Sequence, residues 1–163
     1  MMRLSISPAS ENDFDLIWPI FKTVVSTQDT YIYPCDISKS DAFDVWMVKG
    51  NTPYIAKIDD EVVGTYTIRP NKIGNGAHVC NAGFMVNPDF RKQGIGRKMC
   101  EHALEEAKNL GFKAMQFNVV VSTNEIAFKL WKSLGFNVIG SVPKAFNHGQ
   151  KGLVDIYIMH RFL

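Results

Sequence analysis

The segment NPDFRKQGIGRKM, residues 87–99, places two glycines and several basic side chains at what reads as a helix entrance. Gly94 and Gly96 carry no β-carbon, so backbone N–H groups can converge there on a ligand. A helix N-terminus adds unpaired N–H donors and the positive end of the helix dipole. The basic residues around the turn are Arg91, Lys92, Arg97 and Lys98. This combination favours a phosphate-bearing ligand.

A second interpretation of the same residues is purely structural. The dinucleotide-binding fingerprint needs a third glycine and the P-loop needs Gly-Lys-Ser/Thr, and this segment has neither. A tight turn from a strand into a helix, with its basic residues in solvent, would look the same. The turn alone leaves both interpretations open.

Amide side chains interrupt the apolar segments that follow the turn and precede it. Asn118 lies inside FNVVV, where a buried amide needs partners and therefore either bonds a neighbouring loop or faces a ligand. Asn124 lies in STNEIAF, where it either caps a helix or contacts a ligand. His78 and Asn81 lie in HVCNAGF, and for His78 we favour an exposed histidine at the start of a strand.

Composition bounds the class of protein. A chain of 163 residues with 46% apolar and 21% charged residues predicts one globular domain, residues 1–163. The net charge of +2 argues against a dedicated nucleic-acid surface. No transmembrane segment or signal peptide is expected. Three widely spaced cysteines fit neither a disulfide framework nor a zinc cluster, so we expect reduced thiols, a cytoplasmic location and no metal.

The elements that must position these residues follow from hydrophobic periodicity. We expect strands at residues 2–7, 53–59, 62–70, 77–86, 113–121, 136–146 and 153–163, and helices at residues 13–27, 41–49, 94–110 and 122–134. The strands at 77–86 and 113–121 flank a crossover helix and should be parallel, whereas the others should be antiparallel. The fold class is therefore mixed α/β, with a single mostly antiparallel sheet of about seven strands and about four helices.

Two local features of the helices are also predicted. The apolar stripe of the helix after Gly94 includes Leu110, and Pro8 is expected to break the first strand. Ser122 and Glu125 have the spacing of a capping box, and Ile126 belongs to the apolar face of the last helix.

FMVNPDFRKQGIG and NEIAFKLWKSLGF together resemble the GNAT acetyltransferase superfamily. The first is similar to its pyrophosphate-binding motif, Gln/Arg-x-x-Gly-x-Gly/Ala, and the second to its motif Asn-x-x-Ala-x-x-Leu-Tyr-x-x-x-Gly-Phe. The specific match covers residues 82–136. The resemblance implies the acyl-CoA N-acyltransferase fold, in which the two parallel strands splay apart, and acetyl-CoA as cofactor.

The resemblance also assigns residues to the cofactor. The main chain of residues 84–86 would bond the pantetheine arm as an added strand would, and the N–H groups of residues 93–97 would hold the pyrophosphate. The residues implied to bind the cofactor are Phe84, Met85, Val86, Arg91, Lys92, Gln93, Gly94, Ile95, Gly96, Arg97, Asn124, Ala127 and Trp131.

For catalysis the resemblance implies less. Asn118 would lie at the reaction centre, and the Phe84 backbone N–H would stabilise the oxyanion. Trp131 stands where the family often has a tyrosine that protonates the leaving thiolate; an indole cannot supply that proton near neutral pH. The family's glutamate base is absent from HVCNAGF. Trp131 therefore either packs or contacts the cofactor, and the acid and base stay open.

Two sets of residues bear on the identity of the acceptor. Tyr31 and Tyr33 either line the acceptor pocket or simply pack their loop. Asn81, Asn118 and Asn124, together with the segments AFKLWKSLGF and SVPKAF, resemble the branch of the family that acetylates proline-like cyclic imino acids. In that case Asn81 and Asn118 would contact the acceptor.

The expected function is transfer of an acetyl group from acetyl-CoA to the amine of a small, amino-acid-like molecule. The alternatives are acetylation of protein N-termini or lysines, and a CoA-binding module without catalysis. No nucleic-acid or membrane partner is expected, and a homodimer is allowed for.

Overall fold

One seven-stranded sheet forms the centre of the protein. The computed structural model describes residues 3–48 and 50–163. The strand order is β1-β2-β3-β4-β5-β7-β6. The strands are β1 (Leu4–Pro8), β2 (Thr52–Ile58), β3 (Glu61–Pro70), β4 (Val79–Val86), β5 (Ala114–Val121), β6 (Asn137–His148) and β7 (Gly152–Phe162). The predicted fold class is confirmed.

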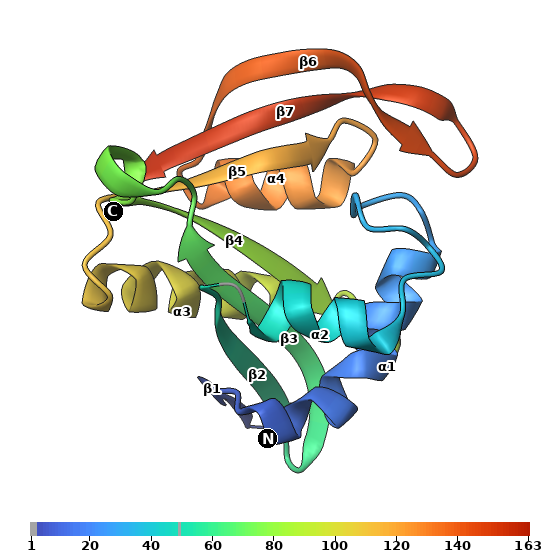
Figure 1. The fold of residues 1–163 in the computed structure, drawn as a ribbon, viewed down its shortest axis with the longest axis vertical. Coiled ribbons are helices and arrows are strands. Elements are labelled where there is room, and N and C mark those ends of the chain that lie inside the picture. Colours follow the sequence, from blue (N-terminus) through green and yellow to red (C-terminus); the bar gives the residue numbers. More distant parts are fainter. Residues whose placement is uncertain (1–2, 49) are drawn as a thin grey trace.

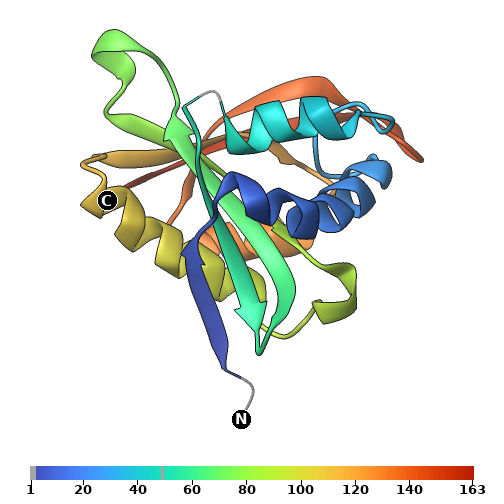
Figure 2. The same ribbon diagram turned by 60° about the horizontal axis from the view of Figure 1, so that its bottom comes forward.

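Helices cover both faces of this sheet (Figures 1 and 2). The α-helices are α1 (Phe14–Ser26), α2 (Lys39–Met47), α3 (Ile95–Asn109) and α4 (Glu125–Ser133), and short 3-10 turns are η1 (Glu11–Asp13), η2 (Gly74–Gly76) and η3 (Pro88–Phe90). α1 and α2 pack with Ile55 and Met85 in one core cluster. α3 packs in a second cluster on the opposite face, with Tyr66 and Phe117. Successive side chains of β4 therefore pack in two different core clusters, because side chains alternate between the two faces of a strand.

The parallel pair at the centre of the sheet is joined only at one end. β4 pairs with β5 at Val79–Ala114 and Cys80–Met115 and nowhere beyond, whereas β3 pairs with β4 along its length. In Figure 1 the two strands start close together and then diverge. The expected splay is confirmed, and it leaves one side of β4 without a strand partner.

Several local expectations are wrong. Pro8 lies inside β1, an edge strand where a missing N–H costs no ladder bond. Leu110 is 48% exposed because it is the C-cap of α3, past the last turn that faces the sheet. Ile126 is 79% exposed in the first turn of α4, a helix with no fully buried residue. Lys49, which the predicted helix 41–49 includes, lies outside the described residues.

None of the helices in the described ranges is long and apolar enough to cross a membrane.

Candidate active site

Alternation along β4 decides which main-chain groups face the splay. Asn71 N–H donates to the Val79 carbonyl, and Asn87 N–H donates to the Val63 carbonyl, so odd-numbered residues of β4 bond β3. Even-numbered residues between them must direct their N–H and C=O groups toward β5. Phe84 and Val86 therefore present their main chain to the splay. Met85 presents its main chain to β3 and its side chain to the α1–α2 core, so it drops out of the expected main-chain contacts.

The glycine turn has the geometry of an anion site. Gly94 is the N-cap of α3 with a φ of 75°, and Lys92 also has a positive φ, 63°. The first helical bond runs from Lys98 N–H to the Gly94 carbonyl. Within the described residues, no hydrogen bond uses the N–H groups of residues 93–97. These donors converge at a helix N-terminus, which is the arrangement that binds phosphate.

The basic side chains of the turn divide into two groups. Arg91, Lys92 and Lys98 are exposed. Arg97 instead donates from Nη2 to the Ser133 hydroxyl at 2.7 Å, and its Nη1 lies 3.7 Å from Glu101. The Arg97 side chain thus ties α3 to α4, and the expected contact of Arg97 with the cofactor stays a prediction.

Gly96 lies where three elements meet. A β-carbon built on Gly96 would lie 3.6 Å from Leu130 Cδ2 of α4 and 3.8 Å from Val86 Cγ2 of β4. These are ordinary van der Waals distances, so packing alone does not require glycine here. Close approach of a ligand gives the glycine a reason.

Trp131 lies between the splayed strands. Its ring centroid is 4.9 Å from that of Phe117 on β5 and 5.3 Å from that of Phe84 on β4, with Phe136 at 6.4 Å. The ring therefore packs across the gap that β4 and β5 leave open. This is the packing role that the sequence left open; a contact with the cofactor remains a prediction.

Asn124 is the N-cap of α4. Its Oδ1 accepts from Ala127 N–H at 3.3 Å, and no capping box with Ser122 forms, because the Ser122 N–H is engaged with the Asp155 carbonyl of β7. The predicted Ser122–Glu125 box is wrong. The expected cofactor contacts of Asn124 and Ala127 stay predictions, at the helix end that faces the splayed strands.

Tyr31 reaches the splay from the α1–α2 side. Its hydroxyl donates to the Phe84 carbonyl at 2.8 Å. A β-carbon on Gly83 would lie 3.2 Å from that hydroxyl and 3.4 Å from the Trp46 ring, so Tyr31 covers β4 closely. Burial raises the pKa of Tyr31, and the neighbouring Tyr33 adds to the rise, so Tyr31 stays a neutral hydrogen-bond donor. Tyr33 stacks on Tyr31 with ring centroids 5.9 Å apart.

Asn118 is held by side chains on either side of it. Its Nδ2 donates to Asn71 Oδ1 at 2.7 Å, and its Oδ1 accepts from Gln116 Nε2 at 3.0 Å. Asn71 follows β3 and Gln116 precedes Asn118 on β5, so this amide chain links the two halves of the sheet. Pairing of β5 with β7 is interrupted between Phe117 and Val120, which accommodates Asn118. The amide bonds a loop, as one of the two sequence interpretations held, and its role toward the acceptor stays a prediction.

Sequence reasoning missed the polar residues of β3. Arg69 pairs with Asn81 across β3 and β4, so both side chains lie on the same face of the sheet. From Thr65 onward, odd-numbered β3 residues face the α1–α2 side: the Trp46 indole of α2 donates to Thr65 Oγ1 at 3.0 Å. The alternation of residues 62–70 could have placed Arg69 on this face, but only the register shows that it lies opposite Asn81.

Other candidate groups are unsuited to the site. Cys80 and Cys100 are fully buried, and burial raises the pKa of each thiol to about 12. His78 is exposed, as expected. His148 is 9% exposed, not solvated, and its Nδ1 accepts from the N–H groups of Gln150 and Lys151. Among the described residues, no three His, Cys, Asp or Glu side chains are placed to hold a metal ion.

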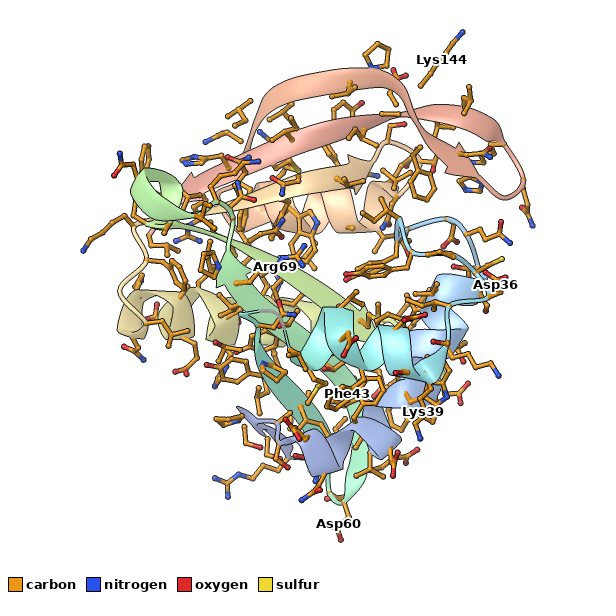
Figure 3. The ribbon with its side chains drawn as sticks, in the orientation of Figure 1. Asp36, Lys39, Phe43, Asp60, Arg69 and Lys144 are labelled. Carbon is orange, nitrogen blue, oxygen red and sulfur yellow. The ribbon has the colours of Figure 1, made fainter. Side chains whose placement is uncertain are left out.

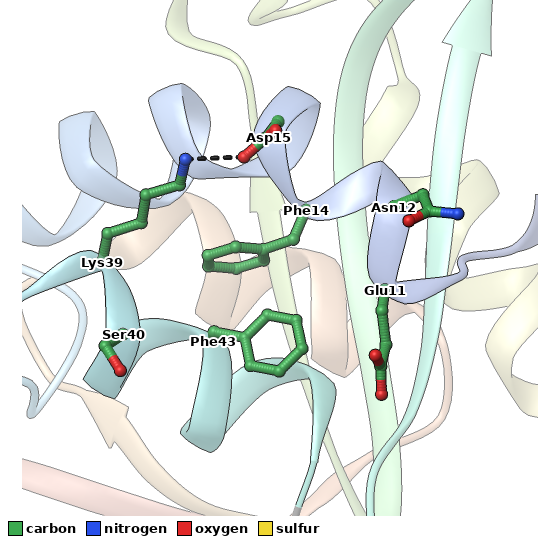
Figure 4. Close-up of a pocket in the computed structure, with 7 residues that line it drawn as sticks. All are labelled: Glu11, Asn12, Phe14, Asp15, Lys39, Ser40 and Phe43. Carbon is green, nitrogen blue, oxygen red and sulfur yellow. Dashed lines mark hydrogen bonds and ion pairs between the residues drawn. The ribbon is translucent and has the colours of Figure 1, made fainter.

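A separate hollow of about 440 Å³ lies between η1, α1 and α2 (Figure 4). Phe14 and Phe43 pack edge to face there, 5.2 Å apart, and Lys39 pairs with Asp15 at 2.6 Å. No residue of β4 or β5 lines it, so it is distinct from the splay.

The comparisons with known proteins agree with this geometry. The profile of the Acetyltransferase (GNAT) family matches residues 15–136. The chain belongs to this family. Structurally it superposes on a GCN5-related N-acetyltransferase from Kribbella flavida with a TM-score of 0.93 and 41% identity over 98% of both chains.

Curated relatives match over shorter stretches. N-acetyltransferase aca1 of Schizosaccharomyces pombe is 40% identical over 98 residues, which are 60% of this chain and 47% of that protein. The ribosomal protein bS18-alanine N-acetyltransferase of Escherichia coli is 40% identical over 52 residues, 32% of this chain and 34% of that enzyme. The aligned part of the chain therefore spans about half the length of aca1 and about a third of the length of the E. coli enzyme.

Acetyl-CoA is the acetyl donor of the GNAT family. The residues present here fit it on three counts. They are the free N–H groups at the glycine turn, the exposed basic residues beside them, and the Phe84 N–H and Val86 main chain, which β5 does not pair.

Proposed function

We propose that the protein is an acetyl-CoA-dependent N-acetyltransferase whose acceptor is the amine of a small, amino-acid-like molecule. The observation that carries the proposal is the end of β4–β5 pairing at Cys80–Met115, next to a helix N-terminus with unused donors. A ligand with an extended arm that ends in a phosphate group would bond both the main chain of β4 and the N–H groups of the helix N-terminus. In a GNAT protein that ligand is acetyl-CoA.

The chain's own groups divide the work of binding. The N–H groups of residues 93–97 hold the pyrophosphate, and Arg91, Lys92 and Lys98 add positive charge. Phe84 and Val86 bond the pantetheine arm. Asn124, Ala127 and Trp131 lie on the α4 side of the same channel. Acetyl-CoA supplies the acetyl group as a reactive thioester.

Phe84 is the residue placed to assist the reaction. Its carbonyl already accepts from Tyr31, so its N–H, which is directed the same way, is the group left to bond the thioester oxygen. A preorganised donor at a developing negative charge is typically worth about 10²–10³ in rate. Tyr31 fixes the adjoining Phe84–Met85 peptide unit from the acceptor side and acts as a positioning residue.

Proton transfer relies on groups of low basicity. The acceptor must lose a proton before its nitrogen can attack, yet the polar groups named at the site are amides, phenols, hydroxyls and the Arg69 cation, none of which is a base near neutral pH. Tyr31 stays protonated because burial raises its pKa. We assign deprotonation to a water chain ordered by Asn81, Asn118 and Asn71, and give Trp131 a packing role.

The acceptor side favours a small molecule. Tyr31, Tyr33 and Trp46 form an aromatic wall over β4, with Tyr31 and Trp46 rings 6.2 Å apart. Protein N-terminus acetylation is the rival, and the E. coli relative that modifies a ribosomal protein supports it. A cytoplasmic location is proposed with the function, since all three cysteines are free.

Thiol release from acetyl-CoA across an acceptor library tests the function. The arms are free amino and imino acids, polyamines, N-terminal peptides and lysine peptides. Release with free amino or imino acids supports the proposal, and release with peptides alone supports the rival. CoA binding without release in any arm would identify a CoA-binding module without catalysis.

A further inference from the structure

Arg69 is a partly buried cation on the acceptor face. It belongs to none of the four ion pairs that the described residues form. It lies on β3 opposite Asn81, and Asn81 is the first β4 residue beyond the last β4–β5 pair. Figure 3 shows the Arg69 side chain near the centre of the molecule, below β5 and α4 in that view. The guanidinium therefore lies at the point where the splay begins.

Two phenols and an amide lie near Arg69. Burial raises the pKa of Tyr33, and the nearby Arg69 guanidinium partly offsets this rise. Arg69 has the same smaller effect on the pKa of Tyr31. The guanidinium is thus close to both phenols of the aromatic wall, and its other neighbour on the face is the Asn81 amide. Among the described residues no carboxylate pairs with Arg69 within 4.0 Å, so this partly buried cation lacks a counter-ion.

A second, independent observation points to a missing ligand. Thr67 is 5% exposed, and its Oγ1 has no hydrogen-bond partner among the described residues. Thr67 is two residues from Arg69 on the same strand, so both side chains lie on one face. Its partner across the ladder is Gly83, next to the Tyr31 hydroxyl. An unsatisfied buried hydroxyl destabilises the folded state, and a bound polar group would remove that cost.

We propose that Arg69 binds a carboxylate of the acceptor and thereby selects free amino or imino acids over amines without a neighbouring negative charge. The guanidinium fork matches a carboxylate in two parallel hydrogen bonds. The acceptor nitrogen, one carbon away from that carboxylate, is then directed to the splay beside Phe84. Asn81 lies between the two points and contacts the same acceptor. This inference rests on the proposed function and names its substrate class.

The test compares each free acid with its own amide. The twenty proteinogenic L-amino acids and their amides are titrated by calorimetry into CoA-loaded protein, and acetylation of the same compounds is measured separately. Wild-type protein should bind at least one acid about 10- to 100-fold more tightly than its amide, the range of a charge-assisted hydrogen bond. Arg69→Gln should remove that preference by weakening the acid alone. Arg69→Lys should keep part of it, since the charge remains and the fork is lost.

Arg3→Gln is the matched control, because Arg3 is an exposed arginine outside the site. It should leave the preference unchanged. Equal weakening of acid and amide in Arg69→Gln would assign Arg69 a structural role and overturn the inference, as would binding of no acid at all. Selective acid binding without acetylation would instead uphold Arg69 and refute the proposed function.

Discussion

Phe84 serves both sides of the sheet through different atoms. Its ring packs with Tyr66, Phe117 and Trp131 on the α3–α4 side. Its carbonyl accepts from Tyr31, which comes from the α1–α2 side. Phe84 is therefore held from both faces of the sheet before any ligand arrives, by its ring on one face and by its carbonyl on the other. Preorganisation of this kind lets a backbone donor act without a cost of reorientation during the reaction.

Trp131→Phe tests whether the indole takes part in the chemistry. The substitution keeps most of the aromatic surface between Phe84 and Phe117 and removes only the N–H and part of the ring. Turnover should fall less than about tenfold, a barrier change of about 1.4 kcal/mol. Steady-state kinetics measure it, with CoA affinity and melting temperature as controls. Trp131→Tyr should keep or raise the rate, because a phenol can donate a proton to the leaving sulfur. A loss of about 10²–10⁴ in Trp131→Phe at unchanged affinity would assign the N–H a part in the chemistry.

Gly96→Asp tests the anion site. The new β-carbon would lie at ordinary distances from Leu130 and Val86, so the fold should persist. The carboxylate would compete with the pyrophosphate for the free N–H groups and repel it, so CoA binding should be lost in a calorimetric titration. Gly96→Ala is the matched control, with the same β-carbon and no charge; it should weaken binding by crowding the ligand, but much less than Gly96→Asp. Wild-type affinity in Gly96→Asp would mean that the turn is only structural.

At the scale of elements, α4 depends on one capping side chain. Asn124→Ala removes the acceptor for Ala127 N–H and should lower the free energy of unfolding by about 1 kcal/mol. Ser122→Ala is the control and should change it little, because the Ser122 contact to β7 uses only its backbone. Urea denaturation of both variants measures the difference. A larger loss in Ser122→Ala would restore the capping box that the sequence predicted.

Elements were predictable from the sequence where periodicity is strong. The order of strands and helices follows from alternation, from the 3.6-residue repeat and from glycines such as Gly111 and Gly135, both with positive φ. The helix cap at Asn124 was not predictable, because Ser122, Asn124 and Glu125 lie close together in the sequence and more than one capping arrangement is compatible with them. Arg69 was missed because pairing of β3 with β4 brings it to Asn81, and register is not written in either strand alone.

At the scale of the molecule, the sheet consists of two parts held together at one end. β1 to β4 form one part and β5, β7 and β6 the other, and only two residue pairs join β4 to β5. Trp131 and the Asn71–Asn118 bond also bridge the parts. The rest of the gap between β4 and β5 is available to the ligand. Binding should therefore stabilise the whole fold and not one loop of it.

CoA should raise the melting temperature of the protein. A ligand that binds only the folded state adds about 2.7 kcal/mol at a free concentration of 100 times Kd. For a domain of this size, about 2–4 °C accompany each kcal/mol, so a rise of roughly 5–10 °C is expected. Differential scanning fluorimetry with millimolar CoA measures it, and Gly96→Asp serves as the control that should not shift. Hydrogen exchange should slow most at Phe84 and Val86, the amides that CoA would occupy, and less at Met85, whose amide already bonds β3 and gains only from the global stabilisation. A melting temperature that CoA does not move would contradict the assignment of the splay as a CoA site, and protection confined to the α3 entrance would mean that the pantetheine arm does not enter between β4 and β5.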